Sequence, residues 1–133
     1  MITRSNRFHG HGSLRYLYTR GKTVRANQLT VRYIINSRRE TWRLAVVVSK
    51  KVHKSAIVRN RIRRRLYEIV RNNQNRISKP YDIALIIFSP LLAELEQQKL
   101  ESIIISSFEK AEIFDNPKDK KTENYVKIEE KEA

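Results

Sequence analysis

The side chains best suited to bind a partner lie in an arginine-rich run near the middle of the chain. The segment VRNRIRRRLYEIVR, residues 58–71, places five arginines between Arg59 and Arg65, and Glu68 is its one acid. Arginine makes planar, paired hydrogen bonds to phosphate. Like charges four residues apart destabilise an isolated helix. The run therefore favours a polyanionic partner that replaces the missing acids over a solvated basic face with no partner.

Three lysines carry the positive charge into the sequence just before this run. Lys50, Lys51 and Lys54 lie in SKKVHKSAIVRN, at the start of a predicted helix whose unpaired N–H groups also attract phosphate. Arginine outnumbers lysine by 16 to 5 before residue 90, which favours nucleic acid over a membrane surface. A lipid-bound helix would also need large aromatic side chains on its inserting side, and the apolar stripe of this helix has none.

Tyrosines near the N-terminus offer a second kind of contact. Tyr16, Tyr18 and Tyr33 could act as platforms on which single-stranded bases stack, because every base has a flat face. The alternative is that these rings belong to the core or its rim, and sequence spacing leaves both interpretations open.

Residues that would make this chain a catalyst by itself are missing. No phosphate-binding glycine loop, HExxH motif or carboxylate pair is present, and only three acidic residues precede residue 90. A protein nuclease with two metal ions needs more carboxylates than that. His9, His11 and His53 lack a third ligand at suitable spacing, and there is no cysteine. We expect neither a metal centre nor catalysis by the protein alone.

Charge divides the chain into two parts. The 133 residues carry a net charge of +14, with 21 basic and 3 acidic side chains in residues 1–89 and 7 and 11 in residues 90–133. The basic part should therefore meet the partner. No apolar stretch approaches the ~20 residues that span a bilayer, and the N-terminus has no signal-peptide core. A cytoplasmic protein is expected.

Hydrophobic periodicity predicts the elements that must hold these side chains. A helix from Ser13 to Arg20 and a short strand near Thr23–Arg25 come first. The alternation of residues in QLTVRYIINS, followed after a polar break by WRLAVVVS, then predicts two strands that form an antiparallel hairpin. The arginine-rich helix should bury one stripe, which consists of Ile62, Leu66, Ile69 and Val70.

The rest of the chain predicts one more strand and a closing helix. Residues 82–88 are apolar on both faces, as in a strand covered on both sides. Ser89 and Pro90 can start a helix that reaches about Lys110. Residues 1–112 should form one small α+β domain in the order helix, strand, strand, strand, helix, strand, helix. Residues 113–133 have few large apolar groups and should form a disordered tail.

The sequence RLAVVVSKKVHKSAIVRNRIRRRLYEIVR, followed by a hydrophobic strand after KPYD, resembles the protein subunit of bacterial ribonuclease P. The helix ending in YTRGKTVR matches the N-terminal part of that family, so the resemblance covers about residues 3–110. It implies a partner RNA that does the chemistry with Mg²⁺ held mainly by that RNA. It also implies that the protein binds this catalytic RNA and the 5′ leader of precursor tRNA, and helps to form the mature tRNA 5′ end.

The resemblance and the charge pattern together assign roles to individual positions. The residues expected to bind RNA are Lys50, Lys51, Lys54, Arg59, Asn60, Arg61, Arg63, Arg64 and Arg65. The leader is expected to lie in a cleft between the first helix and the sheet, lined by Leu14, Tyr18, Val31 and Tyr33. The implied fold is that of the second domain of ribosomal protein S5, with a left-handed β-α-β crossover where sequence alone predicts a right-handed one.

Two other functions fit the basic patch and the small fold. A ribosome-associated or general RNA-binding protein is the first alternative, because many such proteins share both features. A DNA-binding regulator is less favoured, since an arginine-dense helix offers few Asn or Gln side chains for reading base edges.

Overall fold

The computed structural model describes residues 6–7 and 11–115, and for residues 11–13 the backbone alone. Predicted features that involve His9 or residues 116–133 lie outside this part of the chain. The elements follow the predicted order, with two short 3-10 helices added. They are α1 (His11–Arg20), β1 (Lys22–Arg25), β2 (Leu29–Ile35), β3 (Arg43–Val47), α2 (Ala56–Asn72), η2 (Gln74–Arg76), β4 (Tyr81–Ile87), η3 (Pro90–Ala93) and α3 (Gln97–Lys110).

The four strands form one mixed sheet in the order β1-β2-β4-β3. β2 is antiparallel to both β1 and β4, whereas β3 is parallel to β4. The predicted hairpin between β2 and β3 is therefore wrong, because β4 lies between them. β4 is apolar on both faces, with Ala84 and Leu85 fully buried, and such a strand gains most from a central position. The hairpin of this fold joins β1 to β2 instead.

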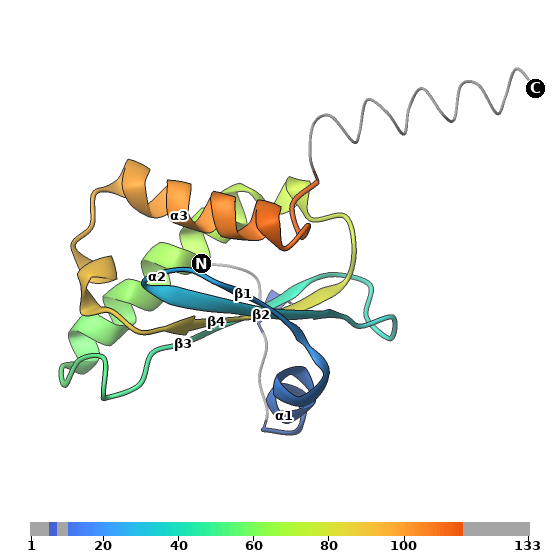
Figure 1. Cartoon of the computed structure of the whole chain (residues 1–133), viewed down its shortest axis with the longest axis horizontal. Helices are drawn as coiled ribbons and strands as arrows, with labels where there is room; N and C mark the ends of the chain where they lie inside the picture. The colour runs from blue at the N-terminus through green and yellow to red at the C-terminus, as the bar shows by residue number, and fades with distance from the viewer. Residues whose placement is uncertain (1–5, 8–10, 116–133) are drawn as a thin grey trace, which may run out of the picture.

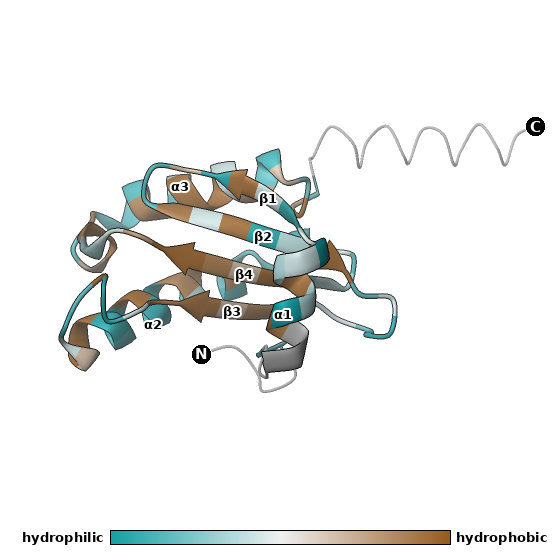
Figure 2. Ribbon diagram, turned by 60° about the horizontal axis from the view of Figure 1, so that its bottom comes forward, coloured by the Kyte–Doolittle hydropathy of each residue, from teal (hydrophilic) through white to brown (hydrophobic). Residues whose placement is uncertain are grey.

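The β3-α2-β4 connection has the hand that the family resemblance implies. In Figure 2 the arrows of β3 and β4 point the same way, β4 lies above β3, and α2 lies behind the sheet. The chain leaves β3 toward the left, returns through α2 behind the sheet and enters β4, which lies above β3. This path is a left-handed crossover. The right-handed crossover expected from general topology is therefore wrong for this chain.

Helices cover the two faces of the sheet unequally. α2 and α3 lie together on one face, and the short α1 lies on the other (Figure 1). Strand residues alternate between these faces, since successive side chains point to opposite sides. On β2, Leu29 and Val31 join the core under α2 and α3, whereas Ile34 packs with Leu17 of α1.

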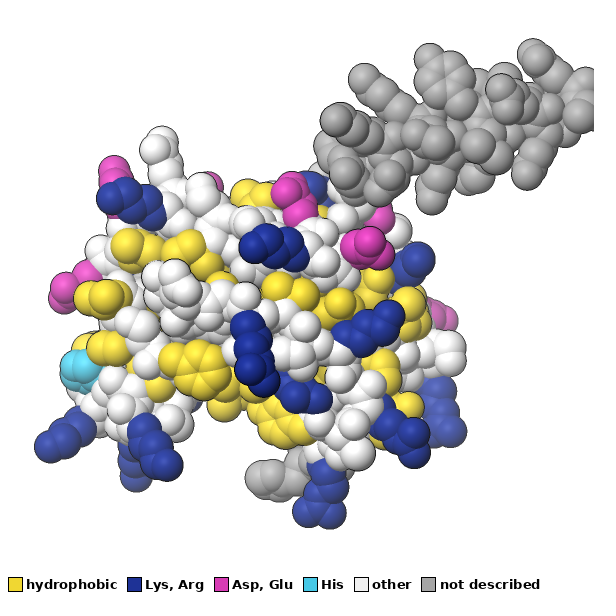
Figure 3. Space-filling view, viewed as in Figure 1, with side chains coloured by type: hydrophobic (Ala, Val, Ile, Leu, Met, Phe, Trp, Pro, Cys, Tyr) yellow, Lys and Arg dark blue, Asp and Glu magenta, His cyan; other side chains and the backbone are white. Residues whose placement is uncertain are grey.

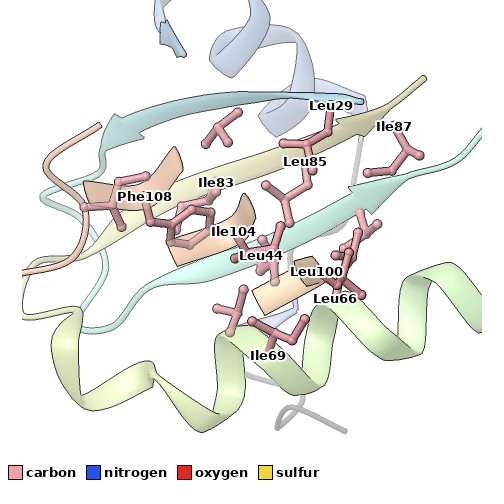
Figure 4. Packing of buried hydrophobic residues seen from close by; sticks show 14 of the residues in the cluster. Leu29, Leu44, Leu66, Ile69, Ile83, Leu85, Ile87, Leu100, Ile104 and Phe108 are labelled. Carbon is pink, nitrogen blue, oxygen red and sulfur yellow. The ribbon is translucent and has the colours of Figure 1, made fainter. Parts of the chain in front are cut away.

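The main core lies between the sheet and the pair α2 and α3. Leu66 and Ile69 of α2 point toward the sheet, as do Leu100, Ile104 and Phe108 of α3 (Figure 4). The predicted stripe of α2 is confirmed, since its four residues have no exposed surface. At ~1.5–3 kcal/mol for each large apolar side chain, this layer supplies most of the favourable free energy of folding.

The closing helix comes in two pieces rather than one. Ser89 starts η3 as predicted, with its Oγ accepting a hydrogen bond from the Leu91 N–H at 3.2 Å. The chain then breaks at residues 94–96, and α3 begins at Gln97. Arg65 of α2 donates to the carbonyls of Leu92 and Leu95 at this break. An interaction from another helix thus satisfies carbonyls that a continuous helix would have bonded itself.

The packed domain continues beyond the predicted boundary at residue 112. Ile113 and Phe114 are 1% and 2% exposed, and the Phe114 ring lies 4.8 Å from that of Phe108. The Asp115 N–H donates to the carbonyl of Arg76 at 2.7 Å. Within the described residues, no helix has both the length and the apolar character needed to cross a membrane.

Candidate RNA interface

The N-terminal half of α2 presents the arginine-rich run to solvent. Ser55 caps this helix, with its Oγ accepting from the Val58 N–H at 3.4 Å, and no acid lies in the first turn. Asn60, Arg61 and Arg64 are exposed. The side chains of Arg61 and Arg64 form no hydrogen bond and no ion pair with any residue that the structure describes. These two guanidinium groups are therefore available for phosphate.

Arg59 and Arg63 are held in place by backbone carbonyls. Arg59 donates to the carbonyls of His53 and Lys54, both at 2.9 Å. Arg63 donates to the carbonyl of Val48 at 3.1 Å and to Asn60 Oδ1 at 2.8 Å. A guanidinium has five N–H donors, so each arginine keeps donors for a ligand. Both side chains are thus positioned at the loop before α2.

Arg65 differs from its neighbours. Its guanidinium donates to the carbonyl of Leu92 at 2.9 Å, to that of Leu95, and to Gln97 Oε1 at 3.4 Å. Burial, and then the nearby Arg61, lower the pKa of Arg65. Arg65 therefore joins α2 to the η3–α3 connection, a structural role that the sequence prediction of an RNA contact did not include. Helical spacing held the signal, because Arg65 lies only about 40° around the helix from the buried Ile69.

The loop between β3 and α2 carries the three lysines. Lys50, Lys51 and Lys54 are all exposed, next to the first turn of α2. The loop is closed by a bond of 3.0 Å from the Val52 N–H to the carbonyl of Ser49. The Ser55 N–H also donates to His53 Nδ1 at 3.0 Å. The lysines thus continue the positive surface of α2, as the sequence predicted.

A surface hollow of about 440 Å³ lies beside the exposed arginines of α2, and we call it the α2 hollow. Arg7 reaches it from the N-terminus, where it pairs with Leu44 at the open edge of β3. Its guanidinium carbon lies 5.9 Å from the centre of the Tyr67 ring. The residues that line the α2 hollow are Arg7, Ile57, Asn60, Arg63, Arg64 and Tyr67. Sequence reasoning missed Arg7 because only the fold brings it to α2.

The four residues predicted to line the leader cleft do not share one surface. Leu14 and Tyr18 lie on α1, and Tyr18 is 39% exposed. Val31 has no exposed surface and packs in the core on the other face of the sheet. Tyr33 lies on that same far face, with its ring 6.1 Å from that of Tyr81. The prediction of one cleft is therefore wrong for Val31 and Tyr33.

The residues of β2 that face α1 are one position away from those predicted. Arg32 donates to the carbonyl of Tyr18 and, at 3.4 Å, to that of Gly21. Its guanidinium carbon lies 5.8 Å from the centre of the Tyr18 ring. Because side chains alternate along a strand, an error of one residue moves the whole set to the opposite face. Thr30, Arg32 and Ile34 are the residues of β2 that lie on the same face of the sheet as α1.

The acidic side chains lie mainly away from these surfaces. In Figure 3 they lie along the upper side, over α3, together with some Lys and Arg side chains, whereas the lower side of this view, around α1, shows Lys and Arg without acidic side chains. In the described part of the chain, no group of three His, Asp or Glu residues is placed to hold a metal ion. The exposed cations on the described surface are suited to a polyanionic ligand.

Comparison with known proteins gives one consistent relationship. The family model described as Ribonuclease P matches residues 2–112. The ribonuclease P protein component of Clostridium botulinum strain Langeland is 35% identical over 112 residues, which cover 84% of this chain and 98% of that protein.

Solved structures agree on the fold. The Staphylococcus aureus RNase P protein superposes with a TM-score of 0.74 at 23% identity, covering 83% of this chain and 98% of that one. For the Thermotoga maritima RNase P protein the TM-score is 0.67 at 23% identity, with coverage of 75% and 92%. On the sequence match and the shared fold together, this chain belongs to the ribonuclease P protein family.

Proposed function

We propose that this chain assists a catalytic RNA in the cytoplasm to remove the 5′ leader of precursor tRNA. The RNA subunit performs the hydrolysis and holds most of the Mg²⁺, while the protein binds that RNA and the leader. The observation that carries this proposal is the pair of exposed arginines, Arg61 and Arg64, on a helix whose opposite side is buried. Such a helix is fixed in place, so its charges are ordered before the RNA binds.

The two RNA partners fit different surfaces. Asn60, Arg61 and Arg64, with the lysines of the preceding loop, suit the structured catalytic RNA because their donors match phosphate. The α1 side of the sheet suits the single-stranded leader, since Tyr18 offers an exposed ring and Arg32 lies against it. Tyr16 is also exposed on α1, but Arg32 lies beside the ring of Tyr18 and not beside that of Tyr16.

Reconstitution tests this proposal directly. The purified protein is added to a bacterial ribonuclease P RNA at low Mg²⁺, and cleavage of precursor tRNA is followed. We expect a marked gain with both components and no cleavage by the protein alone. The absence of any gain would contradict the proposal. Sequencing the RNA that copurifies with the protein then separates this function from ribosome association, which would yield ribosomal RNA.

Two adjacent arginines provide a matched pair of variants. Arg64→Ala should weaken binding to the catalytic RNA and reduce the slope of log affinity against log salt by about 1, as expected for one lost phosphate contact. Arg65→Ala removes the same charge but should mainly lower the free energy of unfolding, because Arg65 bonds the carbonyls of Leu92 and Leu95. Equal losses of RNA affinity in both variants would show that only net charge matters.

A further inference from the structure

A histidine lies in the middle of the positively charged loop before α2. The loop consists of residues 48–55, between β3 and α2, and we call it the lysine loop. His53 is half-buried and lies between the exposed Lys51 and Lys54. Lys50 is exposed in the same loop. Among these four residues, the histidine is the one that does not carry a fixed positive charge.

The His53 ring acts as a hydrogen-bond acceptor. The Ser55 N–H donates to His53 Nδ1 at 3.0 Å. A backbone N–H can only donate, so Nδ1 carries a lone pair and the proton of the neutral ring is on Nε2. An imidazolium has protons on both nitrogens and could not accept this bond. This conformation of the lysine loop therefore requires the neutral form of His53.

The bond from Ser55 closes a turn at the end of the lysine loop. Asn and Asp side chains close the same kind of turn when they accept from the N–H two residues later. In this turn the carbonyls of His53 and Lys54 face Arg59, whose guanidinium donates to both at 2.9 Å. The Ser55 Oγ caps α2 from the same position. The imidazole thus fixes the backbone that joins Lys54 to the first turn of α2.

The start of the lysine loop is held in a different way. Arg63 of α2 donates to the carbonyl of Val48 at 3.1 Å. The Val52 N–H donates to the carbonyl of Ser49 at 3.0 Å. Neither bond involves a group that changes charge near neutral pH. Of the two ends of the loop, only the one that contains His53 can therefore respond to protonation.

We infer that His53 is a positioning residue for RNA binding, because its neutral imidazole fixes the segment that leads from Lys51 through Lys54 into α2. This role rests on the proposed function, in which the lysine loop contacts the catalytic RNA. A loop that is ordered before RNA binds loses less conformational freedom on binding, which favours affinity. The alternative is that the ring itself binds phosphate as an imidazolium, and the two roles depend on pH in opposite directions.

Acid should weaken RNA binding if His53 has the positioning role. Histidine is the side chain whose charge ordinarily changes between about pH 5 and 8. The charged groups around the ring are Lys50, Lys51 and Lys54 of the loop and Arg59 of α2, and no acidic side chain in the described part of the chain bonds any of them. The accepting form of His53 is present at high pH and is lost as the pH falls. Affinity for RNA should fall with it.

Two substitutions at position 53 separate the acceptor from the ring. His53→Asn keeps an acceptor at the same place, because Oδ1 of asparagine and Nδ1 of histidine are both bonded to Cγ. Asparagine also has no group that titrates. His53→Ala removes the acceptor. The probe is a transcript of a bacterial ribonuclease P RNA, and its affinity for the whole protein is measured at fixed salt and Mg²⁺.

At about pH 8, His53→Ala should bind the RNA roughly 2- to 10-fold more weakly than the wild type, the equivalent of one net hydrogen bond. His53→Asn should bind as the wild type does. At about pH 5.5, the wild type should lose several-fold in affinity relative to His53→Asn. Ser55→Ala is the matched control, because it removes the Oγ cap but keeps the N–H, and it should retain the wild-type dependence on pH. The urea midpoint of each variant separates loss of binding from loss of fold.

Three results would overturn the inference. A wild type that gains affinity over His53→Asn in acid would show that the imidazolium itself binds phosphate. A His53→Asn variant that binds as weakly as His53→Ala at about pH 8 would show that the acceptor has no part in RNA binding. Equal binding by all variants would show that the turn has no effect on RNA.

Nuclear magnetic resonance of the free protein tests the turn without RNA. The ring nitrogen shifts of His53 should show a proton on Nε2 at about pH 8, and protection of the Ser55 amide against hydrogen exchange should fall as the ring gains its second proton. A neutral ring with its proton on Nδ1 would overturn the inference whatever the RNA measurements give. A wild-type protein that binds no ribonuclease P RNA would instead contradict the proposed function.

Discussion

On the α2 and α3 side of the sheet, most alternate residues of β2, β3 and β4 are large, apolar and almost without exposed surface. On the α1 side, the alternate residues of the same strands include Arg32, Arg43 and Asp82. The core on that side is a small cluster of Leu17, Ala45 and Ala84. Each strand thus serves both faces. The difference indicates that the face covered by α2 and α3 stabilises the fold, whereas the face beside α1 holds polar groups in fixed positions.

The α1 face holds a buried ion pair at the end of the sheet where Asp82 lies. Arg43 and Asp82 are 6% and 3% exposed, and the guanidinium meets the carboxylate through two hydrogen bonds of 2.8 Å. Asn36 donates to the same carboxylate at 3.0 Å. A buried ion pair contributes little to stability compared with apolar side chains, but losing one partner is costly. The stability of the α1 face therefore depends on a few specific polar contacts rather than on the area of buried apolar surface.

The largest effect should come from removing one member of this ion pair. Asp82→Ala takes the carboxylate from the buried Arg43, and we expect the free energy of unfolding to fall by ~3–5 kcal/mol. Urea unfolding followed by circular dichroism measures the change. Replacing both Arg43 and Asp82 by leucine should recover much of the loss. A single variant that loses under ~1 kcal/mol would mean that water compensates for the missing carboxylate.

The next effect compares two neighbours on β4 that face opposite ways. Leu85 has no exposed surface and packs under α2 and α3, whereas Ile86 faces α1 and is half-buried. Leu85→Ala should lower the free energy of unfolding by ~2–5 kcal/mol, because a cavity remains in the core. Ile86→Ala should cost less than half as much. Similar losses would show that the α1 face is packed as tightly as the other.

Helical spacing predicted most of what stabilises the covered face. The burial of Ile62, Leu66, Ile69 and Val70 can be predicted from the period of one helix alone. The burial of the apolar residues of β4 can likewise be predicted from the neighbouring sequence alone. The strand order could not be predicted in this way. β3 pairs with β4 across the whole of α2, and nothing local distinguishes that pairing from a hairpin with β2.

The positions of the candidate binding residues were predicted where the period of a single helix sets them, and were missed where the register of a strand decides. Arg61 and Arg64 follow from the helical period alone. Choosing Tyr33 rather than Arg32 for the α1 face was an error of one residue, which alternation turns into the wrong side of the sheet. Arg7 could not be found at all, because its place beside Tyr67 depends on a bridge to β3.

The smallest effect on folding, and the clearest on binding, should come from α1. Tyr18 and Tyr16 are 39% and 56% exposed, and because they are two residues apart on a helix, their side chains point about 160° apart. Only Tyr18 has Arg32 beside its ring. Tyr18→Ala should leave stability within about 1 kcal/mol, because the backbone carbonyl that accepts from Arg32 remains.

Affinity for a precursor tRNA with a leader should nevertheless fall by ~1–3 kcal/mol in Tyr18→Ala, the usual contribution of one stacked base. Tyr16→Ala is the matched control and should bind the precursor as the wild type does. Titrating the reconstituted enzyme with precursor and with mature tRNA separates leader contacts from the rest, since only the precursor has a leader. If both variants lose the same affinity, the two rings act as a general surface. If Tyr18→Ala loses stability instead of affinity, its ring belongs to the small core on the α1 face, and that face is built for folding after all.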